Sequence, residues 1–126
     1  MKTKLFWIFG LVMMFAAGPA FGGKAMQMWN CGMENDASEA QVEEAASKWL
    51  AAAKKVDGAE DMEAYILFPV AVNATGETDF IFVVTLPNFA AWGKFWDAYP
   101  SSEAAAMEEG HTFCPDSVVW ESVKVK

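Results

Sequence analysis

Residues 63–92 read EAYILFPVAVNATGETDFIFVVTLPNFAAW, and this stretch decides the fold. Two runs rich in β-branched and aromatic residues, 63–72 and 78–86, predict two strands. The polar residues 73–77 between them contain a glycine and predict the loop of a hairpin. Pro69 cannot donate a hydrogen bond to a neighbouring strand, so we expect the first strand to lie at an edge of the sheet or to be bulged there.

A helix is predicted before this hairpin. Ser38 and Gln41 have the spacing of a capping box, which marks a helix N-terminus. The apolar residues that follow recur at spacings of three and four and form one face: Val42, Ala45, Ala46, Trp49, Ala53 and Val56. We expect Gly58 to end this helix.

A second helix is predicted directly after the hairpin, with Asn88 as its N-cap. Its aromatic side consists of Phe89, Trp92, Phe95, Trp96 and Tyr99. Pro100 interrupts this helix, because proline lacks the amide hydrogen that a helix interior needs. We expect Ser101 or Ser102 to restart a short helix that runs to Glu109 and is closed by Gly110.

Two further strands complete the domain. Residues 25–31 form a short alternating stretch and residues 117–126 alternate clearly, whereas residues 111–116 read as a loop. The element order β-α-β-β-α-β predicts the ferredoxin-like α+β arrangement. In that arrangement two right-handed crossovers place both helices on one face of a four-stranded antiparallel sheet, with spatial strand order 4-1-3-2.

The N-terminus reads as a secretory signal peptide covering residues 1–22. A short basic region with two lysines precedes the apolar run 5–17, and the small residues of 20–22 are typical of a cleavage site. An uncleaved membrane anchor is the alternative, but Pro19 and several glycines disfavour it. We therefore expect a periplasmic or secreted protein that has one domain, residues 23–126, and no membrane segment after cleavage.

Composition excludes several classes of partner. The 126 residues carry a net charge of −8 and contain no arginine. Nucleic-acid surfaces need clustered cations and favour the bidentate guanidinium, so nucleic acid is not an expected partner. An anionic membrane surface is disfavoured for the same reason, and no Gly-rich phosphate-binding loop occurs.

Two cysteines, Cys31 and Cys114, remain in the exported chain. An even number of cysteines in an oxidising compartment predicts a disulfide. The ferredoxin-like order supports this pairing, because it brings the end of the first strand close to the start of the fourth. No CxxC motif occurs, so thiol exchange is not an expected activity.

Both hairpin strands are apolar on both faces, although helices are expected on only one side of the sheet. A hydrophobic strand that runs into a helix with aromatic anchors, as in DFIFVVTLPNFAAW at residues 79–92, resembles the dimeric α+β barrel superfamily. This resemblance covers nearly all of residues 24–126 without a diagnostic motif. It implies a homodimer in which the free sheet faces of two protomers pack against each other.

The aromatic residues suggest a ligand site. Trp92 and Trp96 are one helical turn apart, and with Tyr99 and Phe82 they are candidates to line a cleft between helix and sheet. Several members of the superfamily bind a flat apolar ligand in such a cleft. We therefore expect a homodimeric binding or interaction module for an apolar small molecule, without a cofactor. Packing of these residues in the core and the dimer interface is the alternative.

An enzymatic role is a second alternative. The superfamily includes antibiotic-biosynthesis-type monooxygenases, chlorite dismutase-like haem proteins and haem-degrading enzymes. Haem-degrading members use an asparagine on the first strand and a tryptophan and a histidine near the second helix. The resemblance therefore implies Asn30, Trp92 or Trp96, and His111 as candidate catalytic residues with haem as the cofactor. His111 departs from the pattern, because it follows Gly110 in an expected loop.

A metal site is not expected. His111 is the only histidine, so a histidine-rich site cannot form within one protomer. The pattern of Glu108, Glu109 and His111 has too little specificity to indicate a metal centre.

Overall fold

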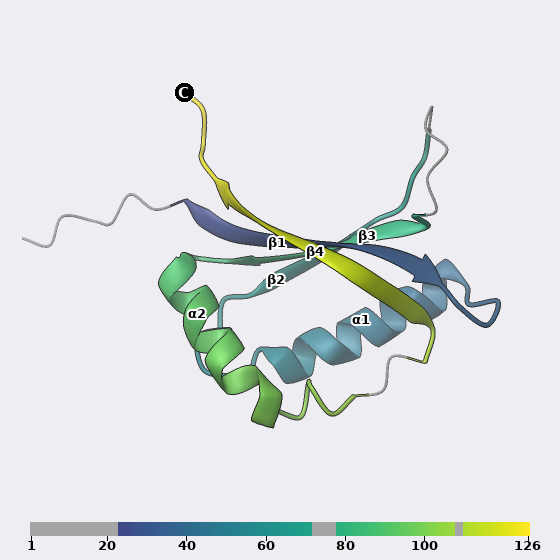
Figure 1. Cartoon of the computed structure of the whole chain (residues 1–126), viewed down its shortest axis with the longest axis horizontal. Helices are drawn as coiled ribbons and strands as arrows, with labels where there is room; N and C mark the ends of the chain where they lie inside the picture. The colour runs from purple at the N-terminus through teal and green to yellow at the C-terminus, as the bar shows by residue number, and fades with distance from the viewer. Residues whose placement is uncertain (1–22, 72–77, 108–109) are drawn as a thin grey trace, which may run out of the picture.

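The structure is a computed structural model that describes residues 23–71, 78–107 and 110–126 (Figure 1). The predicted signal peptide, the predicted hairpin loop at 73–77 and the residues Glu108 and Glu109 lie outside the described residues. Within the described ranges, no helix is both long enough and apolar enough to cross a membrane.

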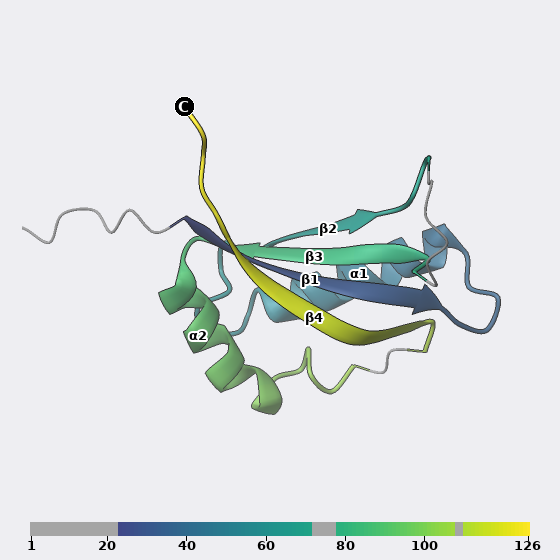
Figure 2. The same cartoon turned by 45° about the horizontal axis from the view of Figure 1, so that its top comes forward.

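The chain forms one four-stranded sheet with two helices on the same face (Figure 1). The elements in chain order are β1 (Lys24–Met33), α1 (Glu39–Ala53), β2 (Glu63–Leu67), β3 (Phe80–Leu86), α2 (Phe89–Ala98), a 3₁₀ helix η1 (Tyr99–Ser101) and β4 (Thr112–Ser122). The strands follow the order β2-β3-β1-β4 across the sheet (Figure 2), and all neighbours are antiparallel. This is the predicted order read from the other edge, so the ferredoxin-like α+β prediction is confirmed.

The sequence signals for the helix starts and the edge strand are confirmed. Ser38 and Gln41 form the capping box of α1, and Asn88 caps α2 by accepting a hydrogen bond from the backbone of Ala91. β2 is an edge strand, as Pro69 predicted. It ends at Leu67 rather than at residue 72. The end lies two residues before Pro69, which cannot donate a hydrogen bond to a neighbouring strand.

The predicted role of Gly58 as the end of the first helix is wrong. α1 ends at Ala53, and the chain continues through successive turns. Gly58 lies in one of these turns with φ of +89°, a conformation that favours glycine. A Cβ atom there would come within 2.6 Å of the backbone oxygen of Ala91. This glycine therefore allows the turn to approach α2 closely.

The segment after α2 also differs from the prediction. The structure has η1 and then turns up to Met107 in place of the expected short helix. β4 begins at Thr112 and ends at Ser122, so residues 112–116 are a strand and not a loop. This strand forms because β1 extends to Met33, which lies opposite Thr112. A register shift at residues 30–32 of β1 accommodates Pro115, and proline is tolerated at such an irregularity in an edge strand.

The predicted disulfide between Cys31 and Cys114 is present in the structure. The Cα atoms of the two residues are 4.2 Å apart, at the register shift between β1 and β4. Cys31 is buried against Val42 and Phe80, so the bond lies on the helix side of the sheet.

The two faces of the sheet bury different amounts of apolar surface. On the helix face, a core surrounds Phe95, Met62 and Leu86, each at most 1% exposed. On the opposite face, the strand register aligns one apolar row across all four strands. This row, here called the free-face row, consists of Tyr65, Val83, Met28 and Val118. Its outer members Tyr65 and Val118 are 48% and 47% exposed, as expected of an uncovered face.

Candidate functional site

A cleft of about 430 Å³ opens on the helix face of the sheet. Five aromatic residues from five elements line it: Trp29 of β1, Trp49 of α1, Phe82 of β3, Trp96 of α2 and Tyr99 of η1. Binding sites for small organic molecules have volumes of roughly 300–1,000 Å³ and mostly apolar walls. The cleft therefore has the size and the character of such a site.

These five residues, here called the aromatic cluster, form a closed circuit of contacts. The distances between ring centroids are 5.8 Å for Trp29–Phe82, 5.5 Å for Phe82–Trp49, 6.4 Å for Trp49–Tyr99, 5.0 Å for Tyr99–Trp96 and 6.3 Å for Trp96–Trp29. Each member keeps part of its surface accessible, whereas the adjoining Phe95 is completely buried. The cluster thus forms a wall of the cleft as well as part of the packing between helices and sheet.

Two of the three indole N–H groups in the cluster are used inside the protein. Trp49 Nε1 donates to Tyr99 Oη at 3.2 Å, and Trp96 Nε1 donates to Gln27 Oε1 at 2.9 Å. Because these donors are already bonded, the two indoles offer mainly ring surface to a ligand.

Gln27 is a buried polar residue, 7% exposed, that contacts two of the tryptophans. Its Oε1 accepts hydrogen bonds from Trp92 Nε1 at 3.0 Å and from Trp96 Nε1 at 2.9 Å. Its Nε2 lies 3.3 Å from Ser117 Oγ. The sequence interpretation missed this residue, and its signal was a polar side chain at the inward position between Ala25 and Trp29.

The structure brings together three of the four predicted ligand-binding residues. Trp96, Tyr99 and Phe82 line the cleft. Trp92 does not line it; its Nε1 donates to Gln27 Oε1, and its ring packs beside Phe89 at 6.3 Å between centroids. Trp29 and Trp49 were missed as lining residues, since a tryptophan on a strand or on an apolar helix face is also the ordinary pattern of a core residue.

The two candidate catalytic residues lie on opposite faces of the sheet. Asn30 is exposed and lies opposite Ile81 and Asp116, on the face away from the helices. His111 lines the cleft on the helix face. Its backbone oxygen accepts a hydrogen bond from the Glu34 amide at 2.9 Å, while its Nδ1 is buried with no hydrogen-bond partner among the described residues.

The rim of the cleft carries an ion pair on α1. Lys48 Nζ is 2.7 Å from Glu44 Oε1. This hydrogen bond and the positive charge of Lys48 lower the pKa of Glu44 below its ordinary value. At neutral pH the two residues therefore cancel each other's charge at the rim.

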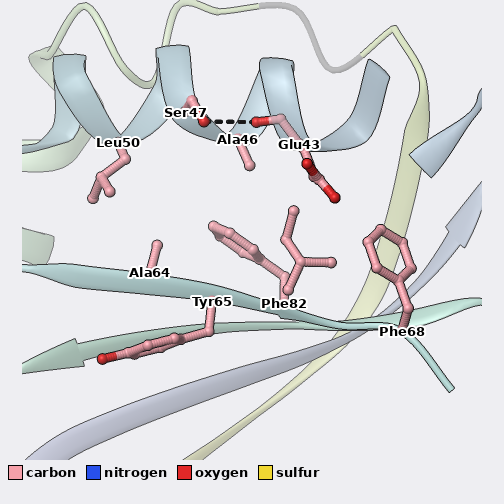
Figure 3. A pocket seen from close by; sticks show the side chains of 9 residues that line it. Glu43, Ala46, Ser47, Leu50, Ala64, Tyr65, Phe68 and Phe82 are labelled. Atoms are coloured by element: carbon pink, nitrogen blue, oxygen red, sulfur yellow. Dashed lines mark hydrogen bonds between the residues drawn. The ribbon is translucent and has the colours of Figure 1, made fainter. Parts of the chain in front are cut away.

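A smaller pocket of about 290 Å³ lies beside the cleft, between α1 and β2 (Figure 3). Ala46 and Phe82 line both spaces, so they separate the two. Figure 3 shows the carboxylate of Glu43 pointing from α1 towards the sheet, where Phe68 and Phe82 form an apolar floor. Among the residues that the structure describes, no group of three or more histidine, cysteine, aspartate or glutamate side chains is placed to hold a metal ion.

No family model and no curated protein matches the sequence. A chlorite dismutase-like protein of known structure is similar at 11% identity and a TM-score of 0.49, and the match covers 82% of this chain but only 45% of that protein. A dabb family protein with a ferredoxin-like fold from Mesorhizobium loti is similar at 14% identity and a TM-score of 0.41, with 82% and 99% of the two chains covered. By its own connectivity and strand order, the chain has a ferredoxin-like fold, the fold that the resemblance to the dimeric α+β barrel superfamily implies.

Proposed function

We propose that this chain is an exported, homodimeric binding module for a small apolar molecule, and that the aromatic cluster is its binding site. One observation carries the proposal: five aromatic residues from five elements converge on one cleft and keep surface accessible there. The adjoining Phe95, by contrast, is 0% exposed and serves the core alone.

Small residues on α1 create the space in front of the cluster. Ala45 and Ala46 lie on the apolar face of α1 and line the cleft. Val42 and Ala53 on the same face are buried against the sheet and the core. Larger residues at the two alanines would fill the cleft, so its volume depends on their size.

The second sheet face supports a homodimer. The free-face row is apolar across all four strands, and a single protomer leaves its ends nearly half exposed. A twofold interface places the same patch of both protomers in contact, so the patch must complement itself. An uncharged row does this without repulsion, although the chain as a whole has a net charge of −8. A second copy of this chain is therefore the proposed cover of the face.

Export is supported by two features. The signal-peptide pattern of residues 1–22 precedes the described domain. The Cys31–Cys114 bond is of a kind that persists in oxidising compartments and is rare in the cytosol. Together they support a periplasmic or secreted location.

Native mass spectrometry of the processed protein, purified from its own host without reductant, tests the function and the assembly. We expect a dimer of oxidised chains that retains additional ligand mass. Ala46→Phe should abolish the retained mass by filling the cleft, whereas Ala51→Phe on the exposed side of α1 should preserve it. A stable monomer would contradict the dimer, and retention unaffected by Ala46→Phe would contradict the site.

The haem-enzyme alternative fits the structure less well. Asn30 lies on the other face of the sheet from His111, and Trp92 is not among the residues that line the cleft. Among the described lining residues, Lys48 is the one cation available for a haem propionate, and it is paired with Glu44. Of the residues that this alternative requires, Trp96 and His111 share the cleft, whereas Asn30 lies on the other face of the sheet.

Titration with haemin separates the two functions. The proposed binding module should develop no Soret band that depends on His111. A saturable band that disappears in His111→Ala would favour haem chemistry over the module proposed here.

A further inference from the structure

We propose that the aromatic cluster prefers ligands that carry a compact cation with an apolar surface, of the quaternary ammonium class, over neutral molecules of the same shape. This inference rests on the proposed function, because it assigns a ligand class to the same cleft. Three properties of the described residues lead to it: the ring surfaces, the charge balance of the cleft and the carboxylates of α1.

The ring surfaces come first. The faces of tryptophan, tyrosine and phenylalanine carry negative electrostatic potential, and a cation within about 6 Å of a ring centroid is attracted to it. Trp49 and Trp96 direct their N–H groups into internal hydrogen bonds with Tyr99 and Gln27. The polar N–H groups of these indoles are therefore engaged with the protein, which leaves ring surface for the ligand.

The charge balance of the cleft also favours a cation. Lys48 is the one lysine among the described lining residues. Its positive charge is neutralised by Glu44, whose Oε1 lies 2.7 Å from Lys48 Nζ. The sequence contains no arginine, and the net charge of the chain is −8. An anionic ligand would meet no uncompensated lysine or arginine in this part of the chain, while the overall field attracts cations.

The carboxylates of α1 add a second negative feature. Glu44 borders the cleft, and Glu43 one residue earlier points into the adjoining pocket above an apolar floor (Figure 3). Phe82 and Ala46 line both spaces. A cation held by the aromatic cluster would thus lie between ring faces and the acidic side of α1.

A matched pair of probes tests the preference for charge. Choline and 3,3-dimethyl-1-butanol have nearly the same shape, but only choline carries a positive charge. Binding of each to the oxidised, processed protein is measured by calorimetry and by tryptophan fluorescence. We expect choline to bind at least about tenfold more tightly, because desolvated contacts of a cation with several rings exceed those of the neutral isostere.

Variants locate the effect. Trp49→Leu removes one ring but keeps an apolar side chain, so it should weaken choline by about tenfold and the alcohol by less than about threefold. Phe82→Leu provides a second test if the first variant does not fold by circular dichroism. Phe89→Leu is the matched control, since Phe89 is 43% exposed on α2 and does not line the cleft.

The outcomes distinguish this inference from the proposed function. Equal affinity for the two probes, or tighter binding of the alcohol, would overturn the preference for a cation. Absence of choline binding would also overturn it, even where native mass spectrometry still shows retained mass that Ala46→Phe removes. In that case the apolar binding module would stand with a neutral ligand. If choline does not bind and native mass spectrometry also shows no retained mass, the binding function itself is rejected.

Discussion

At the scale of single residues, Gln27 has an influence that its sequence context does not reveal. One carboxamide accepts two indole N–H groups and contacts Ser117, so it sets the orientation of Trp92 and Trp96 together. Buried polar groups are tolerated when they are hydrogen-bonded, and they become costly once a partner is removed. The shape of the cleft wall therefore depends on a polar residue behind it.

Gln27→Leu should destabilise the protein by about 2–4 kcal/mol, because it leaves two part-buried indole donors without their acceptor. Urea unfolding followed by tryptophan fluorescence measures this change. Ser117→Ala, which removes only the contact to Gln27 Nε2, should cost less than about 1 kcal/mol. Equal unfolding midpoints for Gln27→Leu and the unmodified protein would refute the role given to Gln27.

Glu63 makes a small contribution to the pH dependence of stability. The hydrogen bond from Lys24, together with its charge, lowers the pKa of Glu63 below its ordinary value of 4.5, and Thr85 adds a further hydrogen bond. A lowered pKa in the folded state stabilises the protein above about pH 4.5 and loses this effect as the pH falls. The difference in urea midpoint between the unmodified protein and Glu63→Gln should be positive at pH 7 and shrink towards zero at pH 3. Asp61→Asn controls for the loss of a carboxylate, and a difference that grew on acidification would contradict this sign.

At the scale of elements, α1 forms one wall of the cleft. In its capping box, the backbone N–H of Gln41 donates to Ser38 Oγ at 3.3 Å, and the backbone N–H of Ser38 donates to Gln41 Oε1 at 2.8 Å. The first turns of α1 border the cleft, whereas the last turn packs into the main core through Ala52 and Ala53. The helix start is therefore held by its cap together with the buried side chain of Val42.

Ser38→Ala should lower the free energy of unfolding by about 1 kcal/mol, since it removes the side-chain oxygen that accepts a hydrogen bond from the backbone N–H of Gln41. The loss should appear first as faster hydrogen exchange in the first turns of α1. Ser47→Ala in the middle of the same helix is the control and should change stability by less than about 0.5 kcal/mol. Equal effects of the two substitutions would show that the cap does not hold the helix start.

At the scale of the whole molecule, the disulfide joins two segments that are 83 residues apart in the sequence. It connects β1 to β4 at the register shift and lies in the wall of the cleft through Cys114. Closing a loop of this length restricts the unfolded chain strongly. The bond therefore stabilises the whole domain as well as one end of the cleft.

Removal of this bond by Cys31→Ala with Cys114→Ala should lower the free energy of unfolding by about 4–5 kcal/mol on the chain-entropy model. Urea midpoints with and without a reductant measure the effect. The unmodified protein should lose stability in the reductant, and the double variant should not respond to it. A double variant as stable as the oxidised protein would contradict the expected contribution.

The free-face row also concerns the whole molecule, because we propose that it forms the interface between two copies of the chain. Val118→Lys places a charge in the row and should halve the mass seen by light scattering. Val125→Lys, at a 90% exposed position beyond β4, should leave the mass unchanged. A dimer that persists in Val118→Lys would place the interface elsewhere.

Local sequence patterns determined the element order, the starts of both helices, the edge position of β2 and the pairing of the cysteines. These features depend on hydrogen bonds and apolar spacing within a few residues, or on the topology that follows from the element order. The predictions for Gly58, for a short helix up to residue 109 and for a loop at 111–116 were wrong. For Gly58 and for residues 112–116, a contact distant in sequence decided the local structure: the approach of Gly58 to Ala91 and the pairing of Met33 with Thr112.

The candidate site was decided by the tertiary structure. Residues distant in sequence, such as Trp49 and Tyr99, meet in the aromatic cluster because α1 and η1 lie over the same face of the sheet. Asn30 and His111 are separated because the alternation of β1 turns Asn30 away from the helices, whereas His111, just before β4, borders the cleft on the helix face. The sequence by itself determined which side chains were available. Only the packing of helices on the sheet decided which of them share a cleft, because a cleft forms from distances between elements and not from spacing along the chain.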